Sequence, residues 1–293
     1  MLKRGQSCLA QVSKPTLLSL INQATSILTD AGVDSPRLSS RLIMAFVLGW
    51  SQEKLVLHPH YQLTPALCSD FDDLLARRAS GEPLAYLVGQ KEFYGREFAV
   101  DRDVLVPRPE TEQIIELAVS SFEHKSNLLC LDVGTGSGIL AITMALEIPG
   151  CQCLGCDISF PALKIARQNA EKHSVSDVAF FFASDMGKEI KPGSIDFIVS
   201  NPPYLSEFEL KVVSKEVAGF EPHQALVSAE DGFYHLRRLE KTAGLTLKKQ
   251  GMVFAEMGKD QGESLKRIFS SWMSVTVHKD LAGHDRVLTA VKP

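Results

Sequence analysis

The chain has 293 residues, of which 45% are hydrophobic and 23% charged, and its formal net charge is −4. This composition is ordinary for a globular protein, and the length leaves room for a large domain and a smaller one. The acidic balance argues against a protein that holds nucleic acid mainly through phosphates, because such proteins usually carry a basic excess. No apolar run approaches the length of a membrane-spanning helix, so we expect no membrane partner.

The first residues allow two interpretations. Residues 1–29 contain three bases, several serines and no acid, which faintly resembles a transit peptide. However, apolar residues from Thr16 onward already have the spacing of a structural helix, which leaves only about fifteen residues before it. We therefore expect a cytoplasmic protein with a short N-terminal extension.

Three apolar stripes at helical spacing predict helices in the first part of the chain. One lies between Leu17 and Leu28, and another, between Leu38 and Val47, is preceded by Ser35 as N-cap and Pro36 in the first turn. The third runs from Leu67 to Leu75. Helices this short are marginal alone, so we predict that residues 1–78 form a small helical bundle domain.

Residues 79–112 are rich in glycine, proline and aromatic residues, and we interpret them as a connector between domains. Within it, "EFYGREFAV" predicts a β-hairpin with Gly95 near the turn. A helix with Ile114 and Ile115 on its apolar side is expected to begin at Glu110. The second domain then covers residues 113–293.

From residue 128 onward, apolar strands alternate with helices. The expected strands are "LLCLDV", "CQCLGCD", "VAFFFAS", "IDFIVS", "GMVFAEM" and a last one, "DRVLTAV", which we expect to be antiparallel. The segments "GILAITMALEI" and "PALKIARQNAEKH" are expected helices between strands. This alternation predicts an α/β fold with a mostly parallel sheet covered by helices on both faces.

Cys151, Cys153 and Cys156 have a spacing that could suggest a metal site. They lie in an apolar expected strand, in which alternate residues point to opposite faces, and no histidine accompanies them. We therefore interpret them as buried thiols and expect no bound metal. The six cysteines in a chain of 293 residues do not indicate a disulfide scaffold either.

A glycine-rich turn, "LDVGTGSG", follows the first strand of the second domain. Its spacing does not fit the dinucleotide fingerprint, because Ile139 stands where glycine or alanine is required, and no lysine follows as in a P-loop. Asp132, just before the turn, disfavours a pyrophosphate and suits a cationic ligand such as S-adenosylmethionine.

Acidic residues also end the next two strands. Asp157 can accept both hydroxyls of a ribose, and Ser184-Asp185 is positioned to reach an adenine amino group. Each acid alone could be a solvated residue at a turn, but together with Asp132 they indicate a nucleoside site at the carboxyl edge of the sheet.

The fourth strand ends in Asn201-Pro202-Pro203-Tyr204, which alone is either a rigid turn or a clamp for a planar amine. An amide nitrogen is a poor nucleophile because its lone pair is delocalised. The Asn201 side-chain oxygen and the Pro202 carbonyl could accept both N–H hydrogens and aim that lone pair, while Tyr204 stacks on the planar group.

At this point the chain resembles the PrmC/HemK family, the class I methyltransferases that modify the glutamine of the Gly-Gly-Gln motif in peptide chain release factors. The resemblance extends from about Thr16 to the end. It rests on "AGVDSPRLSSRLIMAFVLG", "RASGEPLAYLVGQKEFYGREFAV", "VLVPRPETE", "LDVGTGSG", "SNPPY" and "FEPHQALVSAEDG". It implies a Rossmann-like, mostly parallel seven-stranded sheet, S-adenosylmethionine as cofactor, and a small N-terminal domain that helps to dock the release factor.

The resemblance also implies roles for individual residues. The methionine part of the cofactor would be wrapped by Gly134, Thr135, Gly136, Ser137 and Gly138. Its ribose would bind Asp157, and its adenine would lie near Asp185 and Met186, with Asn201 close to the methyl group. The glutamine amide would bind the four residues from Asn201 to Tyr204, of which Asn201, Pro202 and Tyr204 carry the catalysis. Residues 107–112 would line the same site.

Two rival functions stay open. An N6-adenine DNA or RNA methyltransferase also uses such a turn, because a flipped base presents the same planar amine. A binding protein that kept the fold and lost the chemistry is the other. We expect release factors as partners, no sequence-specific nucleic acid, and a monomer.

Overall fold

The computed structural model describes residues 15–293, so the predicted N-terminal extension lies outside the described residues. The chain forms two compact units that divide between Val88 and Gly89, and each is described here by itself. No helix in the described range is both long and apolar enough to cross a membrane.

The first unit is a helical bundle. It consists of α1 Leu17–Asp30, α2 Pro36–Leu48, α3 Gln52–Leu57, α4 Pro65–Ala79 and α5 Leu84–Val88. The three predicted helices correspond to α1, α2 and α4, and their apolar stripes meet in a shared core that includes Leu28, Ile43 and Phe71. The short helices α3 and α5 were not predicted, because one or two turns contain too few residues to display a period.

The start of α2 corrects one detail. Ser35 is the N-cap residue and Pro36 opens the helix, as predicted, but the Ser35 side chain makes no capping hydrogen bond. A capping side chain reaches the first-turn N–H groups from an extended backbone. Ser35 instead has a left-handed backbone, with φ of 51°. Thr16 and Thr64, whose backbones are extended, do cap α1 and α4.

The second unit begins with the predicted hairpin. Strands β1 Gln90–Phe93 and β2 Arg96–Ala99 pair antiparallel, and Tyr94 and Gly95 form the turn. The helix expected at Glu110 begins slightly later: a 3₁₀ turn, Pro109–Thr111, precedes α6 Glu112–Ser121. The hairpin belongs to the second unit, so the predicted connector, residues 79–112, is not a separate body.

A seven-stranded sheet forms the centre of this unit, in the order β5-β4-β3-β6-β7-β9-β8. The strands are β3 Leu129–Val133, β4 Gln152–Asp157, β5 Ala179–Ala183, β6 Ile195–Ser200, β7 Leu247–Glu256, β8 Met273–Lys279 and β9 Asp285–Val291. The first five are parallel, and β9 is antiparallel to both β7 and β8. The predicted α/β fold is confirmed, although the residue pattern did not mark β8.

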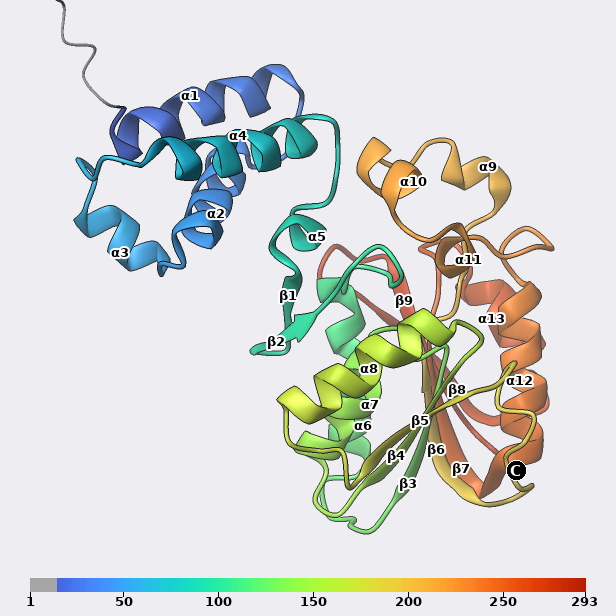
Figure 1. The fold of residues 1–293 in the computed structure, drawn as a ribbon. Coiled ribbons are helices and arrows are strands. Elements are labelled where there is room, and N and C mark those ends of the chain that lie inside the picture. Colours follow the sequence, from blue (N-terminus) through green and yellow to red (C-terminus); the bar gives the residue numbers. More distant parts are fainter. Residues whose placement is uncertain (1–14) are drawn as a thin grey trace, which may run out of the picture. The chain divides into compact units, whose positions relative to one another are not determined.

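Helices cover both faces of the sheet (Figure 1). On one face lie α6, α7 Ile139–Glu147 and α8 Phe160–Lys172, and on the other lie α12 Tyr234–Thr246 and α13 Gly262–Ile268. The buried side chains accordingly form two clusters: Ile114, Leu140 and Leu163 belong to one, and Leu236 and Leu265 to the other.

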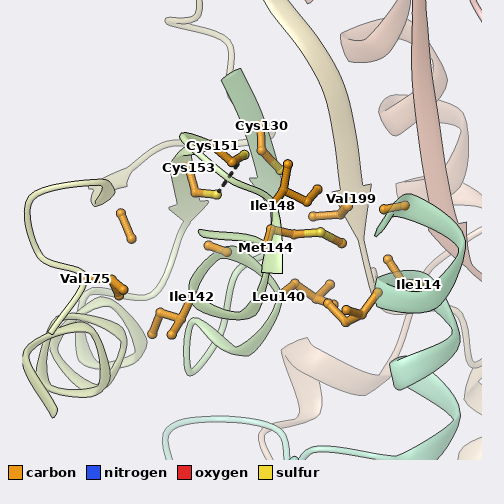
Figure 2. Close-up of a cluster of buried hydrophobic side chains, with 14 of the residues drawn as sticks. Ile114, Cys130, Leu140, Ile142, Met144, Ile148, Cys151, Cys153, Val175 and Val199 are labelled. Carbon is orange, nitrogen blue, oxygen red and sulfur yellow. Dashed lines mark hydrogen bonds between the residues drawn. The ribbon is translucent and has the colours of Figure 1, made fainter. Parts of the chain in front are cut away.

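The buried cysteines follow the alternation of the strand, as predicted. Cys151 and Cys153 lie on one face with their sulfur atoms 3.7 Å apart, next to Cys130 (Figure 2). Cys156 belongs to the cluster on the opposite face. Burial raises the pKa of Cys130 to about 11 and that of Cys156 to about 12, so these thiols stay protonated. They therefore pack as small apolar side chains.

Three short helices follow β6: α9 Glu207–Leu210, α10 Lys215–Phe220 and α11 His223–Leu226. Helices α9 and α10 bury no residue. The segment is closed at its base, because the Leu205 N–H donates to the Leu226 carbonyl and the Ser228 N–H donates to the Leu205 carbonyl, at 3.0 and 2.8 Å. We call residues 205–228 the α9–α11 segment.

Candidate active site

The topology of the sheet creates a crevice at the carboxyl ends of β3 and β6. The chain order runs outward from β3 through β4 to β5, and then returns to place β6 on the other side of β3. Ligands of open α/β sheets bind at such a switch point. The glycine turn follows β3 and the Asn-Pro-Pro-Tyr turn follows β6, so the strand pairing brings these two distant segments together.

Between the two turns lies a cavity with about 1080 Å³ of empty space, including its open mouth. We call it the first cavity. Most of the predicted site residues line it, namely Gly134, Thr135, Gly136, Ser137, Asp157, Asp185, Met186, Asn201, Pro202 and Pro203. Pro107, Arg108 and Thr111 of the "PRPETE" stretch line it as well.

Gly138 has a different position from the other residues of the glycine turn. It is not among the lining residues of the first cavity. A β-carbon built on Gly138 would come within 3.0 Å of Ile142 and 3.1 Å of Ala166 on α8. The residue therefore allows α7 and α8 to pack closely, and we do not place it in contact with a ligand.

Asp132 is also placed differently from the expectation. Its side chain is fully buried and does not line the cavity. One carboxylate oxygen accepts hydrogen bonds from the Thr135 hydroxyl at 2.6 Å and from the Ala141 N–H at 3.2 Å. Burial raises the pKa of Asp132 to about 7. The group thus ties the glycine turn to the start of α7 and does not face a ligand in the first cavity.

Asp157 supports the same turn from the end of β4. Its Oδ2 accepts the Gly136 N–H and its Oδ1 accepts the Ser159 N–H, both at 2.9 Å. A carboxylate has about four acceptor positions, so each oxygen retains capacity for one more donor. Burial raises the pKa of Asp157 above its ordinary value, while these backbone donors oppose the rise. The residue can accept two hydroxyls from the cavity side.

Asp185 and Met186 form the next part of the wall. The Asp185 carboxylate accepts a hydrogen bond from Arg238 on α12 at 2.7 Å, and this bond lowers the pKa of Asp185. Met186 has a left-handed backbone with φ of 63°, and its carbonyl accepts the Thr242 hydroxyl at 3.0 Å. Both residues line the first cavity just after the end of β5.

A second cavity, with about 610 Å³ of empty space, adjoins the Asn-Pro-Pro-Tyr turn. Asn201, Pro202 and Pro203 line both cavities, whereas Tyr204 lines only the second. The remaining lining is largely apolar and comes from Leu105, Arg108, Leu205, Val213, Val217, Ala225 and Leu226. The turn therefore lies between the two cavities and lines both of them.

A buried glutamate joins the two ends of this turn. Glu256, at the end of β7, accepts the Thr111 hydroxyl at 2.6 Å on one oxygen and the Tyr204 hydroxyl at 3.1 Å on the other. The Asn201 side-chain N–H in turn donates to the Thr111 oxygen at 3.1 Å. Sequence reasoning missed Glu256, although the same rule that found Asp157 and Asp185, an acid at the end of a parallel strand, could have identified it.

Arg108, just before the 3₁₀ turn Pro109–Thr111, binds the α9–α11 segment. Its guanidinium donates to Glu221 at 2.6 Å, and the Val106 N–H donates to the same carboxylate at 3.3 Å. The Glu221 side chain is 1% exposed. Burial raises the pKa of Glu221 above its ordinary value, and the Arg108 cation opposes this. The pair fixes the segment that covers one side of the second cavity.

Two family descriptions match the chain. The PrmC N-terminal domain matches residues 19–89, and the methyltransferase small domain matches residues 113–219. A release factor glutamine methyltransferase of Nitratidesulfovibrio vulgaris is 40% identical over 96% of this chain and 97% of its own length. Another protein of that name, from Koribacter versatilis, is 38% identical over 95% of this chain and 99% of its own length.

Among solved structures, the hMettl16 catalytic domain in complex with a MAT2A 3′UTR hairpin superposes with a TM-score of 0.56. It is 16% identical, and the match covers 74% of this chain and 81% of that one. At this identity the likeness concerns the fold alone. The architecture is that of the class I S-adenosylmethionine-dependent methyltransferases, as predicted.

Proposed function

The chain belongs to the release factor glutamine methyltransferase family, and on that premise we propose that it methylates the glutamine of the Gly-Gly-Gln motif in peptide chain release factors. The methyl group would pass from S-adenosylmethionine to the side-chain amide nitrogen. The observation that carries the proposal is the position of the Asn201-Pro202-Pro203-Tyr204 turn, which forms the wall between the first and the second cavity.

The first cavity suits S-adenosylmethionine. Asp157 has acceptor capacity for both ribose hydroxyls, and the backbone of Gly134 and Gly136 lines the wall without side chains in the way. Asp185 and Met186 would hold the adenine, in a polar and an apolar contact respectively. When bound, the cofactor supplies an electrophilic methyl group on a sulfonium.

The protein's own residues would then orient the acceptor. The Asn201 side-chain oxygen and the Pro202 carbonyl would accept the two N–H hydrogens of the glutamine amide, which turns its lone pair toward the methyl group. Proline fixes its own φ angle, so the Pro202 carbonyl needs little ordering. Tyr204 would hold the amide plane. No strong base is needed, because the methylated nitrogen loses its proton readily to water.

The second cavity would receive the chain on either side of the glutamine, and the N-terminal helices would bind a more distant part of the release factor. We further propose that the enzyme acts as a monomer in the cytoplasm. The assignment of the second cavity rests on its apolar lining, which includes Leu105, Val213 and Val217, and the other assignments follow the family.

The test uses S-adenosylmethionine with a labelled methyl group and a purified release factor. We expect one label per release factor, located on the glutamine by mass spectrometry, and none on a release factor in which that glutamine is alanine. Equal labelling of both forms would refute the proposal. Duplex DNA or RNA in place of the release factor tests the N6-adenine alternative, for which label on the nucleic acid alone would be required.

A further inference from the structure

We propose that Thr111 and Glu256 are positioning residues that determine which way the amide of Asn201 faces. The inference rests on the proposed function, because it concerns the orientation that methyl transfer needs. Its basis is a hydrogen-bonded chain of three side chains from three separate elements: β6, the 3₁₀ turn before α6, and β7. Glu256 lies outside the region that matches the methyltransferase small domain, which ends at residue 219.

The hydrogen bond between Thr111 and Glu256 determines the direction of the bond between Asn201 and Thr111. Both Glu256 oxygens accept a hydroxyl, one from Thr111 and one from Tyr204, so the Thr111 hydroxyl uses its single hydrogen to donate to Glu256. The Thr111 oxygen then offers only lone pairs to Asn201. It can pair with the amide nitrogen, 3.1 Å away, and would repel the amide oxygen. The Asn201 oxygen is thereby directed away from Thr111.

This direction decides what the turn can bind. An outward oxygen accepts an N–H of a glutamine amide. A reversed Asn201 would present two N–H donors to the N–H₂ group of the substrate, which is unfavourable for every primary amide acceptor. An asparagine amide alone has no strong preference between the two faces, so the choice must come from its neighbours.

Burial makes this choice firm. Thr111 is 0% exposed and Glu256 is 1% exposed, so neither can exchange its partner for bulk water. A buried donor or acceptor without a partner costs about 1–3 kcal/mol. The other Glu256 oxygen accepts the Tyr204 hydroxyl at 3.1 Å, so one carboxylate binds the last residue of the turn directly and the first, Asn201, through Thr111.

The central variant is Thr111→Val, which keeps the shape and removes the hydroxyl. We expect kcat for the release factor to fall on the order of tenfold or more, with KM for both substrates nearly unchanged. Thr111→Ser keeps the hydroxyl and should restore most of the rate. Glu256→Met should resemble Thr111→Val, because the Thr111 hydroxyl becomes free to donate to the Asn201 oxygen.

Thr143→Val is the matched control for the loss of a buried hydroxyl. Thr143 is 0% exposed, lies on α7, and its hydroxyl has no partner among the described residues. Its replacement should leave kcat unchanged. A second control is the double variant with Asn201→Ala: if Thr111 acts through Asn201, Thr111→Val costs little further rate in that background. Full additivity of the two losses would refute the positioning role.

A second readout does not depend on methyl transfer. The side-chain N–H₂ of Asn201 gives a pair of signals in a ¹⁵N NMR spectrum, assigned by their disappearance in Asn201→Ala. We expect slow hydrogen exchange of this pair in wild type and Thr111→Ser, and exchange at least tenfold faster in Thr111→Val. Identical exchange in Thr111→Val would overturn the inference. If wild type does not label a release factor, the proposed function fails, whereas this measurement still decides the inference.

Discussion

The buried Asp132 gives the sharpest prediction about stability. Its carboxyl is 0% exposed, and although one oxygen accepts two hydrogen bonds, the other has no partner among the described residues. Replacement by asparagine keeps the shape and can keep both hydrogen bonds through its single oxygen. The variant Asp132→Asn therefore removes the ionisation while leaving the packing of the glycine turn nearly unchanged.

The pKa of Asp132 sets the size and the sign of the effect. Burial raises this pKa from an ordinary value of 3.8 to about 7. The native state thus holds the proton more tightly than the unfolded chain, and the protein loses stability as pH rises from about 4 to about 7. At about 1.4 kcal/mol per pKa unit, the loss amounts to about 4 kcal/mol, and Asp132→Asn does not suffer it.

Urea unfolding of wild type and Asp132→Asn at several pH values between 4 and 8 measures this difference. The unfolding free energy of the variant minus that of wild type should rise by about 4 kcal/mol as pH increases across this range. Asp177→Asn, at an exposed turn, is the control and should show no such trend. A difference that stays constant with pH, or falls, would refute the reasoning that Asp132 is a poorly solvated acid behind the turn.

Three further changes test the site. Asn201→Ala should leave cofactor binding, measured by calorimetry, nearly intact and reduce kcat on the order of a hundredfold or more; a variant with near-normal kcat would contradict its role. Asp157→Ala should weaken cofactor binding first, because the residue also holds the Gly136 N–H at 2.9 Å; a defect in kcat alone would contradict the ribose contact. Glu221→Ala removes the partner of Arg108, so trypsin should cleave the α9–α11 segment several times faster than in wild type; unchanged cleavage would show that the ion pair does not fix it.

The sequence was sufficient for the parts of the fold that depend on periodicity and on turn chemistry. Strand β3, helix α7 and the hairpin at Tyr94-Gly95 lie where the pattern placed them. The meeting of the glycine turn with Asn201 could also be predicted, because parallel strands present their carboxyl ends at one edge. The residues of the Asn-Pro-Pro-Tyr turn alone fit either a rigid turn or a clamp for a planar amine. The glycine turn beside it favours the clamp.

Other features depend on contacts between distant residues, which a local pattern does not contain. Strand β8 has mostly half-exposed or exposed residues, so it lacks the apolar run that marked the other strands. Asp132 resembles a ligand-facing acid in sequence, and only the packing of α7 shows that it points behind the turn. The role proposed for Glu256 depends on its hydrogen bond with Thr111, which is 145 residues away in the sequence.

Glycine is required at two positions of the glycine turn for different physical reasons. Alanine variants of Gly136 and Gly138 can distinguish these reasons. Gly136 has φ of 53°, lines the first cavity, and has space for a β-carbon, with nothing within 4 Å. Gly138 has φ of 83° but lies outside the lining, and a β-carbon there meets Ile142 and Ala166 at 3.0 and 3.1 Å.

A left-handed alanine costs about 1–2 kcal/mol at either position, so both variants lose stability. Gly138→Ala should lose more, because α7 and α8 must also move apart. Gly136→Ala should instead lose more cofactor affinity than Gly138→Ala at equal stability, because its methyl group enters the cavity wall. Calorimetric cofactor titration and urea unfolding of the two variants measure both quantities, and the reverse ranking in either would show that the turn does not divide its work between ligand and helix packing.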